Sequence, residues 1–479
     1  MEKFGNMNFD ELVRATDERI NDFHNLKKEG LLCINDDFVP AVHYPPITKY
    51  PPIEYDKMFE NYKLPADKIM DVYIHIPFCE KRCIYCHYPS LYKATEESKD
   101  TYLNALEKEF DIYKRILGLE KPQIRVALIG GGTPTDLTPK QLERLLKTFN
   151  EKFDLSKIKQ FNVDVSPSTL VGDIGRERLK IMRDYGVDRL TIGVQSLNET
   201  ILKQMNRDNH KPVILEAIKN TLTYGFQLNI EFIFGYPNQT LQSWYEDLQE
   251  MVKLDAHEIH FYRLKVQAYG DQQGTINRVE KDKYPSIDDT MRMKEMAILF
   301  MEENGYYENL RRVFTKNKKY ISLYAYDQCC NLYDQMSFGL TAFSSLRDRF
   351  VLNTQKFNEY YASIEEGKLP YNRGFIRNQD EQERWSIILQ LKNYNIRKKL
   401  FKERTGVEIE NTKFYPAFSL LKEYGLVEEN ENIIQLTRKG AFFADEISEL
   451  FYSTCFIPFD KTLYNEGRLN PYTISHNKQ

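Results

Sequence analysis

The sequence predicts an α/β protein, a partial (β/α)6 barrel with an N-terminal extension and a C-terminal winged-helix-like domain. Three observations lead to this fold. Six short apolar segments alternate with amphipathic ones, a proline-rich stretch precedes them, and helical segments that end in a hairpin follow them. Strands that each lead into a helix pair in parallel, and right-handed crossovers curl such a sheet towards a barrel. Loops at the carboxyl ends of the strands then carry the chemistry.

The barrel is expected over residues 72–270. Its strands are rich in Ile, Val, Leu and Phe, and we place them at 72–76, 125–129, 161–165, 189–194, 228–234 and 259–264. Helical periodicity fills the intervals at 102–117, 140–153, 176–185, 213–224 and 241–254. Residues 271–378 are expected to extend the barrel and connect it to the last domain.

The two ends of the chain differ from the barrel in pattern. Residues 1–71 form the extension, and four prolines between residues 44 and 54 predict an extended chain there. Helices are expected at 381–392, 396–404 and 413–424, and a hairpin follows them. That order is typical of a winged-helix domain, which we place at 379–455, with a tail at 456–479.

Composition limits the classes of partner. The 479 residues carry a net charge of −4, so nothing predicts a polyanion held by bulk charge. The candidate recognition helix has only Lys413 and Lys422 as cations, and Glu428, Glu429 and Glu431 make the wing acidic, so we expect no nucleic acid partner. Seven cysteines without a disulfide-like pattern fit a reducing cytoplasm, and no apolar run is long enough to span a membrane.

Three cysteines, Cys79, Cys83 and Cys86, follow the first strand with the spacing Cys-x3-Cys-x2-Cys. An iron–sulfur cluster held by protein alone takes four thiolates, so three would leave one iron open to another ligand. An open position distinguishes a reactive metal site from a structural one. The alternatives are a zinc site completed by His75 or His87, or three unrelated thiols.

The run from Tyr73 to Cys86 reads Tyr-Ile-His-Ile-Pro-Phe-Cys-Glu-Lys-Arg-Cys-Ile-Tyr-Cys and resembles the cluster loop of the radical S-adenosylmethionine (SAM) enzymes. It is most similar to their HemN-like branch, the oxygen-independent coproporphyrinogen III dehydrogenases. The resemblance implies a 4Fe–4S cluster on the three cysteines, SAM on the open iron, and a 5′-deoxyadenosyl radical formed when an electron passes through the cluster. It also implies an electron donor such as flavodoxin or ferredoxin.

The resemblance assigns contacts to this first SAM. Gly131, Gly132 and Thr133 match the segment that binds its methionine part, where glycines let the backbone approach a ligand with N–H groups exposed. Asp164 stands after the third strand, where the family usually has glutamate, and a turn-capping aspartate is the alternative. Tyr73 would also contact SAM, unless it is ordinary barrel packing.

Three further segments match in order and spacing. Gln195, Arg207 and Glu231 stand where coproporphyrinogen dehydrogenases hold a second SAM, and Glu231 replaces the usual aspartate. Arginine suits this role because its fork binds a carboxylate bidentately. Tyr85 would pack beside the cluster near the second SAM. The alternative is a structural ion pair between Arg207 and Glu231.

Two departures from the family pattern narrow the activity. Tyr88 occupies the position where the porphyrinogen dehydrogenases carry an extra cysteine, and Trp244 and Trp385 do not form the haem chaperones' His-Asn-x-x-Tyr-Trp motif. The two-SAM methyltransferase-like members are therefore the closest group. The expected activity is radical methyl transfer to a large unsaturated substrate, a tetrapyrrole such as haem or a natural-product scaffold. Oxidative decarboxylation of coproporphyrinogen III and non-enzymatic haem delivery are the alternatives, and no catalytic proton donor is identified.

Overall fold

The computed structural model describes residues 7–32, 43–53, 57–86, 88–207, 210–264, 283–453 and 455–456. Six parallel strands form the centre of its largest sheet and follow one another in chain order. They are β1 (Ile69–Ile76), β4 (Gln123–Gly131), β5 (Gln160–Val165), β6 (Arg189–Gln195), β7 (Gln227–Phe234) and β8 (Glu258–Arg263). The predicted α/β fold with a parallel barrel sheet is confirmed.

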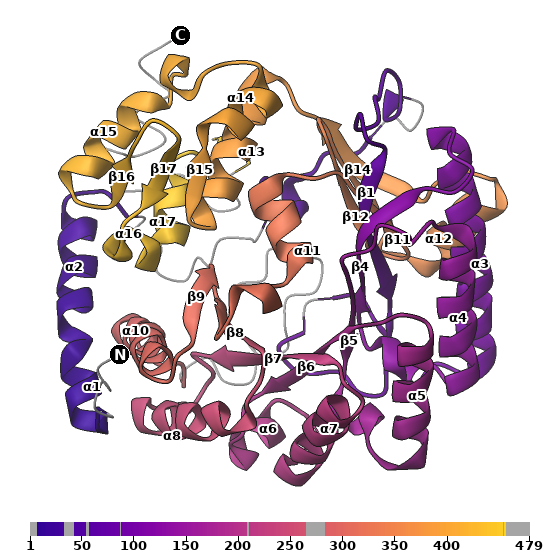
Figure 1. Cartoon of the computed structure of the whole chain (residues 1–479), viewed down its shortest axis with the longest axis horizontal. Helices are drawn as coiled ribbons and strands as arrows, with labels where there is room; N and C mark the ends of the chain where they lie inside the picture. The colour runs from indigo at the N-terminus through magenta and orange to yellow at the C-terminus, as the bar shows by residue number, and fades with distance from the viewer. Residues whose placement is uncertain are drawn as a thin grey trace.

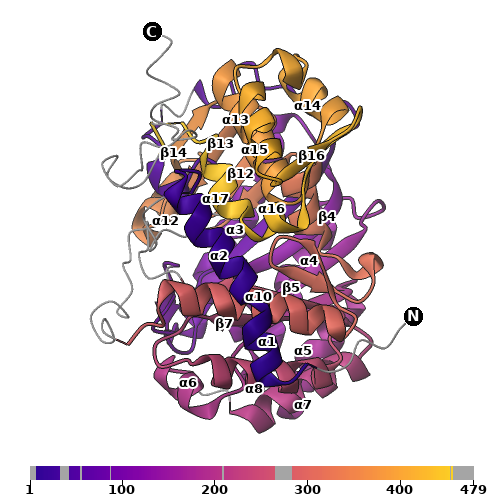
Figure 2. The same cartoon turned by 90° about the vertical axis from the view of Figure 1, so that its left-hand side faces the viewer.

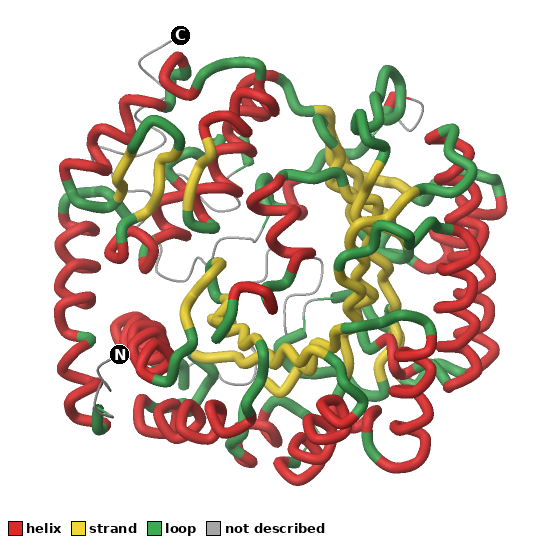
Figure 3. The backbone as a smooth tube through the Cα atoms, viewed as in Figure 1, coloured by secondary structure: helices red, strands yellow, loops and turns green. Residues whose placement is uncertain are grey.

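Helices cover the outer side of these strands. Figure 3 shows the strands as an arc with helices outside it, and Figure 1 identifies them. They are α3 (Glu96–Leu117), α4 (Pro139–Lys152), α5 (Gly172–Asp184), α6 (Glu199–Gln204), α7 (Lys211–Thr223) and α8 (Leu241–Met251). Four of them begin with a side-chain N-cap, from Thr95, Thr138, Asn198 and Thr240, which explains why helix follows strand at these points.

Later strands extend both edges of the sheet. β11 (Gln335–Phe338) pairs in parallel with β1, and β12 (Phe343–Leu346), β13 (Arg349–Asn353) and β14 (Tyr371–Ile376) continue from it in antiparallel order. At the other edge, β10 (Val313–Thr315) pairs with β8, and β9 (Tyr307–Leu310) pairs with β10. All of these strands lie between residues 307 and 376, and the expected role of residues 271–378 as an extension of the barrel stays a prediction.

The concave face of the central strands is polar. Along β5 to β8 every second residue is polar, and the alternate residues, such as Val163, Ile192 and Ile230, are apolar and fully or almost fully buried under the helices. The polar positions are Asn162, Asp164, Arg189, Thr191, Gln195, Asn229, Glu231, Glu258, His260 and Tyr262. The barrel interior is therefore built for a polar ligand.

Residues 320–327, which include α11 (Leu323–Tyr326), close the amino-terminal end of the barrel. The Gln160 side chain donates to the Ile321 carbonyl and accepts from the Leu323 N–H. Arg189 donates to the Tyr320 carbonyl over 2.8 Å. Figure 1 shows α11 on the concave side of the sheet. Residues 320–327 thus cover this end of the barrel, and the carboxyl ends of the strands are the expected place for a ligand.

The N-terminal helices pack against α10 and the C-terminal region. Helices α1 (Phe9–Ala15) and α2 (Asp17–Lys28) cross α10 (Ile287–Glu303), as Figure 2 shows, and Asp22 of α2 forms an ion pair with Lys439. Residues 43–53 are mostly extended with one 3-10 turn (Ile47–Lys49), and Pro52 forms a β-bridge with Arg373. This agrees with the extended chain that the prolines predict.

The last region contains the predicted helices and hairpin, with an added strand. Its elements are α13 (Gln379–Lys392), β15 (Asn395–Arg397), α14 (Lys398–Thr405), α15 (Tyr415–Glu423), β16 (Val427–Glu429), β17 (Ile433–Leu436), α16 (Arg438–Phe442) and α17 (Ala444–Glu449). Lys413 and Lys422 form ion pairs with Asp380 and Glu429. The division of the chain into domains stays a prediction.

Candidate active site

The cysteine loop lies at the carboxyl end of β1. Strand β2 (Phe78–Cys79) pairs in parallel with β3 (Leu91–Tyr92), and the Cys86 N–H donates to the Cys83 carbonyl over 3.1 Å. All three cysteines are half-buried free thiols. Burial raises the pKa of the Cys79 thiol to about 12, so a neighbouring cation is needed to hold it as a thiolate at neutral pH.

The donor set consists of three thiols on one short loop, which fits a 4Fe–4S cluster with one open iron. Among the described residues, no three His, Cys, Asp or Glu side chains are grouped closely enough to form a metal site. His75, a candidate fourth zinc ligand, places Nδ1 3.0 Å from the Tyr73 hydroxyl, and burial lowers its pKa to about 3. His87 lies outside the described residues.

The glycine segment that ends β4 holds the cysteine loop at close range. A β-carbon on Gly132 would lie 2.6 Å from the Phe78 carbonyl oxygen and 2.9 Å from Cys79 Sγ, and one on Gly131 would lie 2.7 Å from the His75 ring. The N–H groups of Gly132 and Thr133 donate to the Ile76 and Phe78 carbonyls. These two N–H groups are therefore not exposed for a ligand, which corrects that part of the prediction.

Asp164 and Tyr73 lie together beside the same segment. A β-carbon on Gly130 would lie 2.4 Å from Asp164 Oδ2 and 3.3 Å from the Tyr73 ring. Burial, with the nearby Glu231 carboxylate, raises the pKa of Asp164 to about 8, although Asn162 donates to its Oδ1 over 3.1 Å. The structure thus brings both predicted contacts of the first SAM to one place at the mouth of the barrel.

Arg207 joins the candidate second site to the cysteine loop. Its Nη1 lies 2.8 Å from the Tyr85 hydroxyl and 3.4 Å from Cys83 Sγ, and its Nη2 donates to the Gly193 carbonyl over 2.5 Å. Gln195 extends over Gly193, where an added β-carbon would lie 2.7 Å from its Nε2. Among the described residues, Arg207 forms no ion pair with a carboxylate, so the structural pair with Glu231 is not formed.

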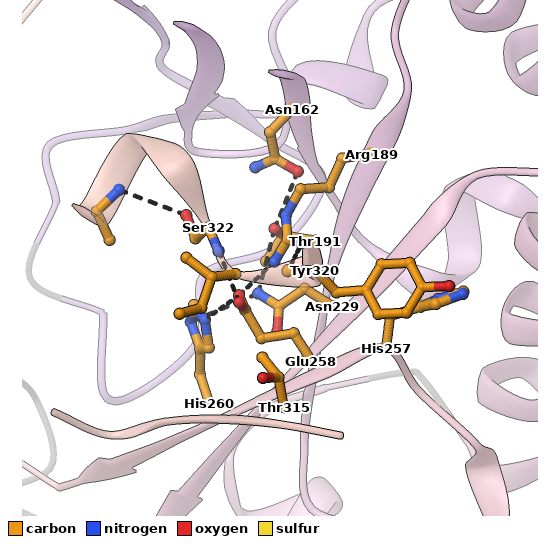
Figure 4. Close-up of polar contacts among 12 residues, drawn as sticks. Asn162, Arg189, Thr191, Asn229, His257, Glu258, His260, Thr315, Tyr320 and Ser322 are labelled. Carbon is orange, nitrogen blue, oxygen red and sulfur yellow. Dashed lines mark hydrogen bonds and ion pairs between the residues drawn. The ribbon is translucent and has the colours of Figure 1, made fainter. Parts of the chain in front are cut away.

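Glu231 has different partners. It lies beside Gly193 in the β6–β7 ladder, and its Oε1 is 3.3 Å from the Tyr262 hydroxyl and 3.6 Å from His260 Nδ1. His260 Nε2 lies 2.6 Å from Glu258, which Arg189 also binds, and Figure 4 shows these three side chains converging. Burial opposes charge on the ring, but Glu258 and Glu231 raise the pKa of His260 to about 9. A charged imidazolium therefore faces Glu231.

The sequence analysis did not identify two groups of residues that shape this site. One is the chain of Arg189, Glu258 and His260, which the alternation of polar residues in buried strands could have revealed. The other is Asp247 on α8, which accepts from the Ser196 hydroxyl over 2.9 Å and the Leu197 N–H over 3.2 Å. These bonds fix the turn after Gln195, whose φ is +71°. No local pattern indicates this role.

Comparison with known proteins places the geometry in a family. Residues 73–251 match the radical SAM superfamily. The haem chaperone HemW of Bacillus subtilis is 28% identical over 388 residues, which cover 79% of this chain and 98% of that protein. An oxygen-independent coproporphyrinogen III oxidase of Helicobacter pylori is 25% identical over 408 residues, covering 82% and 87%.

A solved structure agrees with these relatives. Coproporphyrinogen III oxidase (HemN) from Escherichia coli, described as a radical SAM enzyme, superposes with a TM-score of 0.72 at 24% identity, covering 87% of this chain and 96% of that one. None of the helices in the described ranges is long and apolar enough to cross a membrane. The matched segment contains the cysteine loop, the glycine segment and all the residues assigned to SAM. Residues 73–251 are thus a radical SAM domain, and the chain as a whole is similar to HemN and HemW proteins.

Proposed function

We propose that the chain is a radical SAM enzyme with two SAM sites, which transfers a methyl group from the second SAM to an sp2 carbon of a large unsaturated substrate. Three cysteines would hold the 4Fe–4S cluster, and Gln195, Arg207 and Glu231 would hold the second SAM. When bound, the cluster supplies the electron that cleaves the first SAM to methionine and a 5′-deoxyadenosyl radical. A carrier such as flavodoxin or ferredoxin would reduce it in the cytoplasm.

One observation carries this proposal. The Arg207 guanidinium contacts Cys83 and Tyr85 with one nitrogen and the Gly193 carbonyl with another, so this residue of the proposed second site lies directly against the cysteine loop. Chemistry between two bound SAM molecules requires such proximity, because reacting groups must be held close together and aligned.

The charges of the barrel mouth suit SAM, which carries a sulfonium, an ammonium and a carboxylate. Glu231 would contact one cationic group, Asp164 in its ionised form would contact another, and Arg207 offers a guanidinium to the carboxylate. His260 stands behind Glu231, with Nδ1 3.6 Å from its Oε1. Residues 320–327 cover the amino-terminal end of the barrel, away from the proposed SAM sites.

Ligand stoichiometry and products test the proposal. Anaerobic reconstitution should give about four irons and four sulfides per chain, and equilibrium dialysis should give two SAM molecules. Turnover should release both 5′-deoxyadenosine and S-adenosylhomocysteine. One bound SAM, with no S-adenosylhomocysteine from any accepted substrate, would show that the methyl-transfer proposal is wrong.

A tetrapyrrole substrate is supported by the relatives, which act on coproporphyrinogen III or serve as haem chaperones. Oxidative decarboxylation of coproporphyrinogen III is the second candidate. Against it, Tyr88 stands where the family's extra cysteine would be, 57% exposed and with its ring 6.2 Å from that of His75. Mass spectrometry of coproporphyrinogen III incubated with SAM separates loss of carbon dioxide from gain of a methyl group.

Haem delivery is the candidate from another class, supported by the similarity to HemW. Trp244 and Trp385 are both buried in the core, and Trp244 donates to the Met293 carbonyl over 2.9 Å. Neither tryptophan can therefore supply the exposed haem motif that the chaperone branch carries. A haem titration that shows stoichiometric binding, together with no SAM turnover, would favour delivery.

A further inference from the structure

A short turn after α6 grips the cysteine loop. We call residues 205–207 the clamp turn. The Ile84 N–H donates to the Met205 carbonyl over 3.2 Å, and Asn206 Nδ2 donates to the Arg82 carbonyl over 2.7 Å. Asn206 adopts a φ of +59°, which directs the turn towards the loop. Together with Arg207, three successive residues of the turn bind residues 82–85.

Arg207 differs from the other two residues because it reaches a sulfur. Its Nη1 donates to Cys83 Sγ over 3.4 Å and to the Tyr85 hydroxyl over 2.8 Å, while Nη2 donates to the Gly193 carbonyl. The buried Nε has no hydrogen-bond partner among the described residues. One guanidinium thus contacts a cluster ligand and has one further donor, the buried Nε, that no described residue uses.

We propose that Arg207 is a positioning residue that tunes the cluster and couples it to the second site. A cationic donor to a ligand thiolate stabilises the more negative, reduced state of an iron–sulfur cluster, so the contact should make the cluster easier to reduce. A carboxylate bound to the same guanidinium would partly neutralise it and weaken this effect. Only this coupling depends on the proposed second SAM; the effect on the cluster depends on the Cys83 contact alone.

The alternative is that Arg207 only anchors the loop through Tyr85 and Gly193. In that case substitution would change how much cluster assembles but not the midpoint potential of the cluster that does assemble. The midpoint potential is therefore the readout that separates a tuning role from a purely structural one.

The first experiment is an EPR redox titration of reconstituted protein without SAM. Arg207→Met removes the charge and the donors, and Arg207→Lys keeps the charge with a simpler donor. At a fixed solution potential we expect Arg207→Met to lower the ratio of reduced to oxidised cluster about tenfold. This corresponds to a midpoint potential lowered by ~59 mV for one electron. The midpoint potential of Arg207→Lys should fall between those of Arg207→Met and the wild type.

The exposed Lys203 on α6 provides the matched control, because Lys203→Gln deletes a nearby charge that has no contact to sulfur. Equal midpoints in Arg207→Met and the wild type would overturn the inference.

A second measurement needs no variant to fold. Pulsed EPR on wild-type protein labelled with [15N]arginine should show a 15N coupling to the reduced cluster, and its absence would overturn the inference. The two proposals also fail separately. A lowered midpoint with only one SAM bound would refute the two-SAM function and leave the tuning role, whereas an unchanged midpoint with two SAM bound would do the reverse.

Discussion

The cysteine loop is held on its two sides by different means. Against β4 most contacts are made by backbone: Gly132 and Thr133 donate to carbonyls of residues 76 and 78, and no side chain fits at position 132. The side-chain contact on this side is neutral, since it is the Thr133 hydroxyl that lies 3.8 Å from Cys79 Sγ. Against the clamp turn and β6, two of the contacts are made by side chains, those of Asn206 and Arg207.

This difference means that the loop's shape is fixed on the β4 side, whereas the charge and donors beside it can vary on the other side. A backbone contact at van der Waals distance specifies a shape, and a single added methyl group alters it. A side-chain contact specifies a charge and a donor, which substitution can tune without moving the chain. We therefore expect the β4 side to control cluster assembly and the β6 side to control potential and second-site affinity.

The largest expected effect comes from a matched pair of glycines. Gly132→Ala places its β-carbon 2.6 Å from the Phe78 carbonyl oxygen, a backbone atom that cannot yield, so Cys79 must move. Gly193→Ala meets the Gln195 amide at 2.7 Å, which can rotate, and Arg207 Nη2 at 3.7 Å, which is an ordinary contact distance. Iron analysis after reconstitution should give little or no cluster for Gly132→Ala and about four irons for Gly193→Ala. Equal iron contents in the two variants would show that the two sides of the cysteine loop do not differ in their control of cluster assembly.

Arg207→Ala should have the next largest effect, on the second SAM. Charged hydrogen bonds of this kind are worth about 1.5–3 kcal/mol, so second-site affinity should weaken about 10- to 150-fold. Equilibrium dialysis measures it, with cluster content and uncoupled 5′-deoxyadenosine formation as the controls that should persist. Unchanged SAM stoichiometry and affinity would place the second SAM elsewhere or exclude it.

The sequence predicted the barrel well because its strands carry Ile, Val, Leu and Phe at alternate positions and are separated by segments with helical periodicity. The expected strand at 161–165 is observed as Gln160–Val165, and the strand at 189–194 as Arg189–Gln195. The edge strands β11 to β14 were not predicted individually. They are short, and β11 pairs with β1, which lies more than 250 residues earlier in the chain. The N-terminal helix α1 was also missed, although Asn8 and Glu11 form a capping box.

In the site, too, contacts between residues far apart in the sequence could not be predicted. The cysteines and the SAM-contact positions could be predicted because a resemblance fixed their spacing, and their roles as ligands stay predictions. The contact of Arg207 with Cys83 joins residues separated by 124 positions, and no local pattern specifies it. The polar chain behind Glu231 depends on strand register, which sets Glu231 beside His260. Single-sequence patterns do not determine that pairing.

A smaller effect is expected from pH on the affinity for the first SAM, through Asp164 beside β4. Asp164 is neutral below about pH 8 and ionised above it, since burial and Glu231 raise its pKa. A cationic SAM prefers the carboxylate, so affinity for the first SAM should rise about tenfold between pH 7 and 9 and then level off. Asp164→Asn should remove this rise, whereas Asp173→Asn, at a fully exposed aspartate on α5, should keep it. A wild-type affinity that is flat over this range would show that Asp164 does not contact SAM.

The smallest expected effect tests the clamp turn without touching a charge. Asn206→Gly keeps the backbone at a φ of +59°, which glycine adopts freely, and deletes only the hydrogen bond from Nδ2 to the Arg82 carbonyl. A neutral hydrogen bond is worth about 0.5–1.5 kcal/mol, so release of iron to a chelator should accelerate about 2- to 12-fold. The midpoint potential should stay at the wild-type value, because the Cys83 contact belongs to Arg207. If Asn206→Gly shifts the potential as far as Arg207→Met, the loop's position rather than the guanidinium sets it, and the two sides of the loop act in the same way after all.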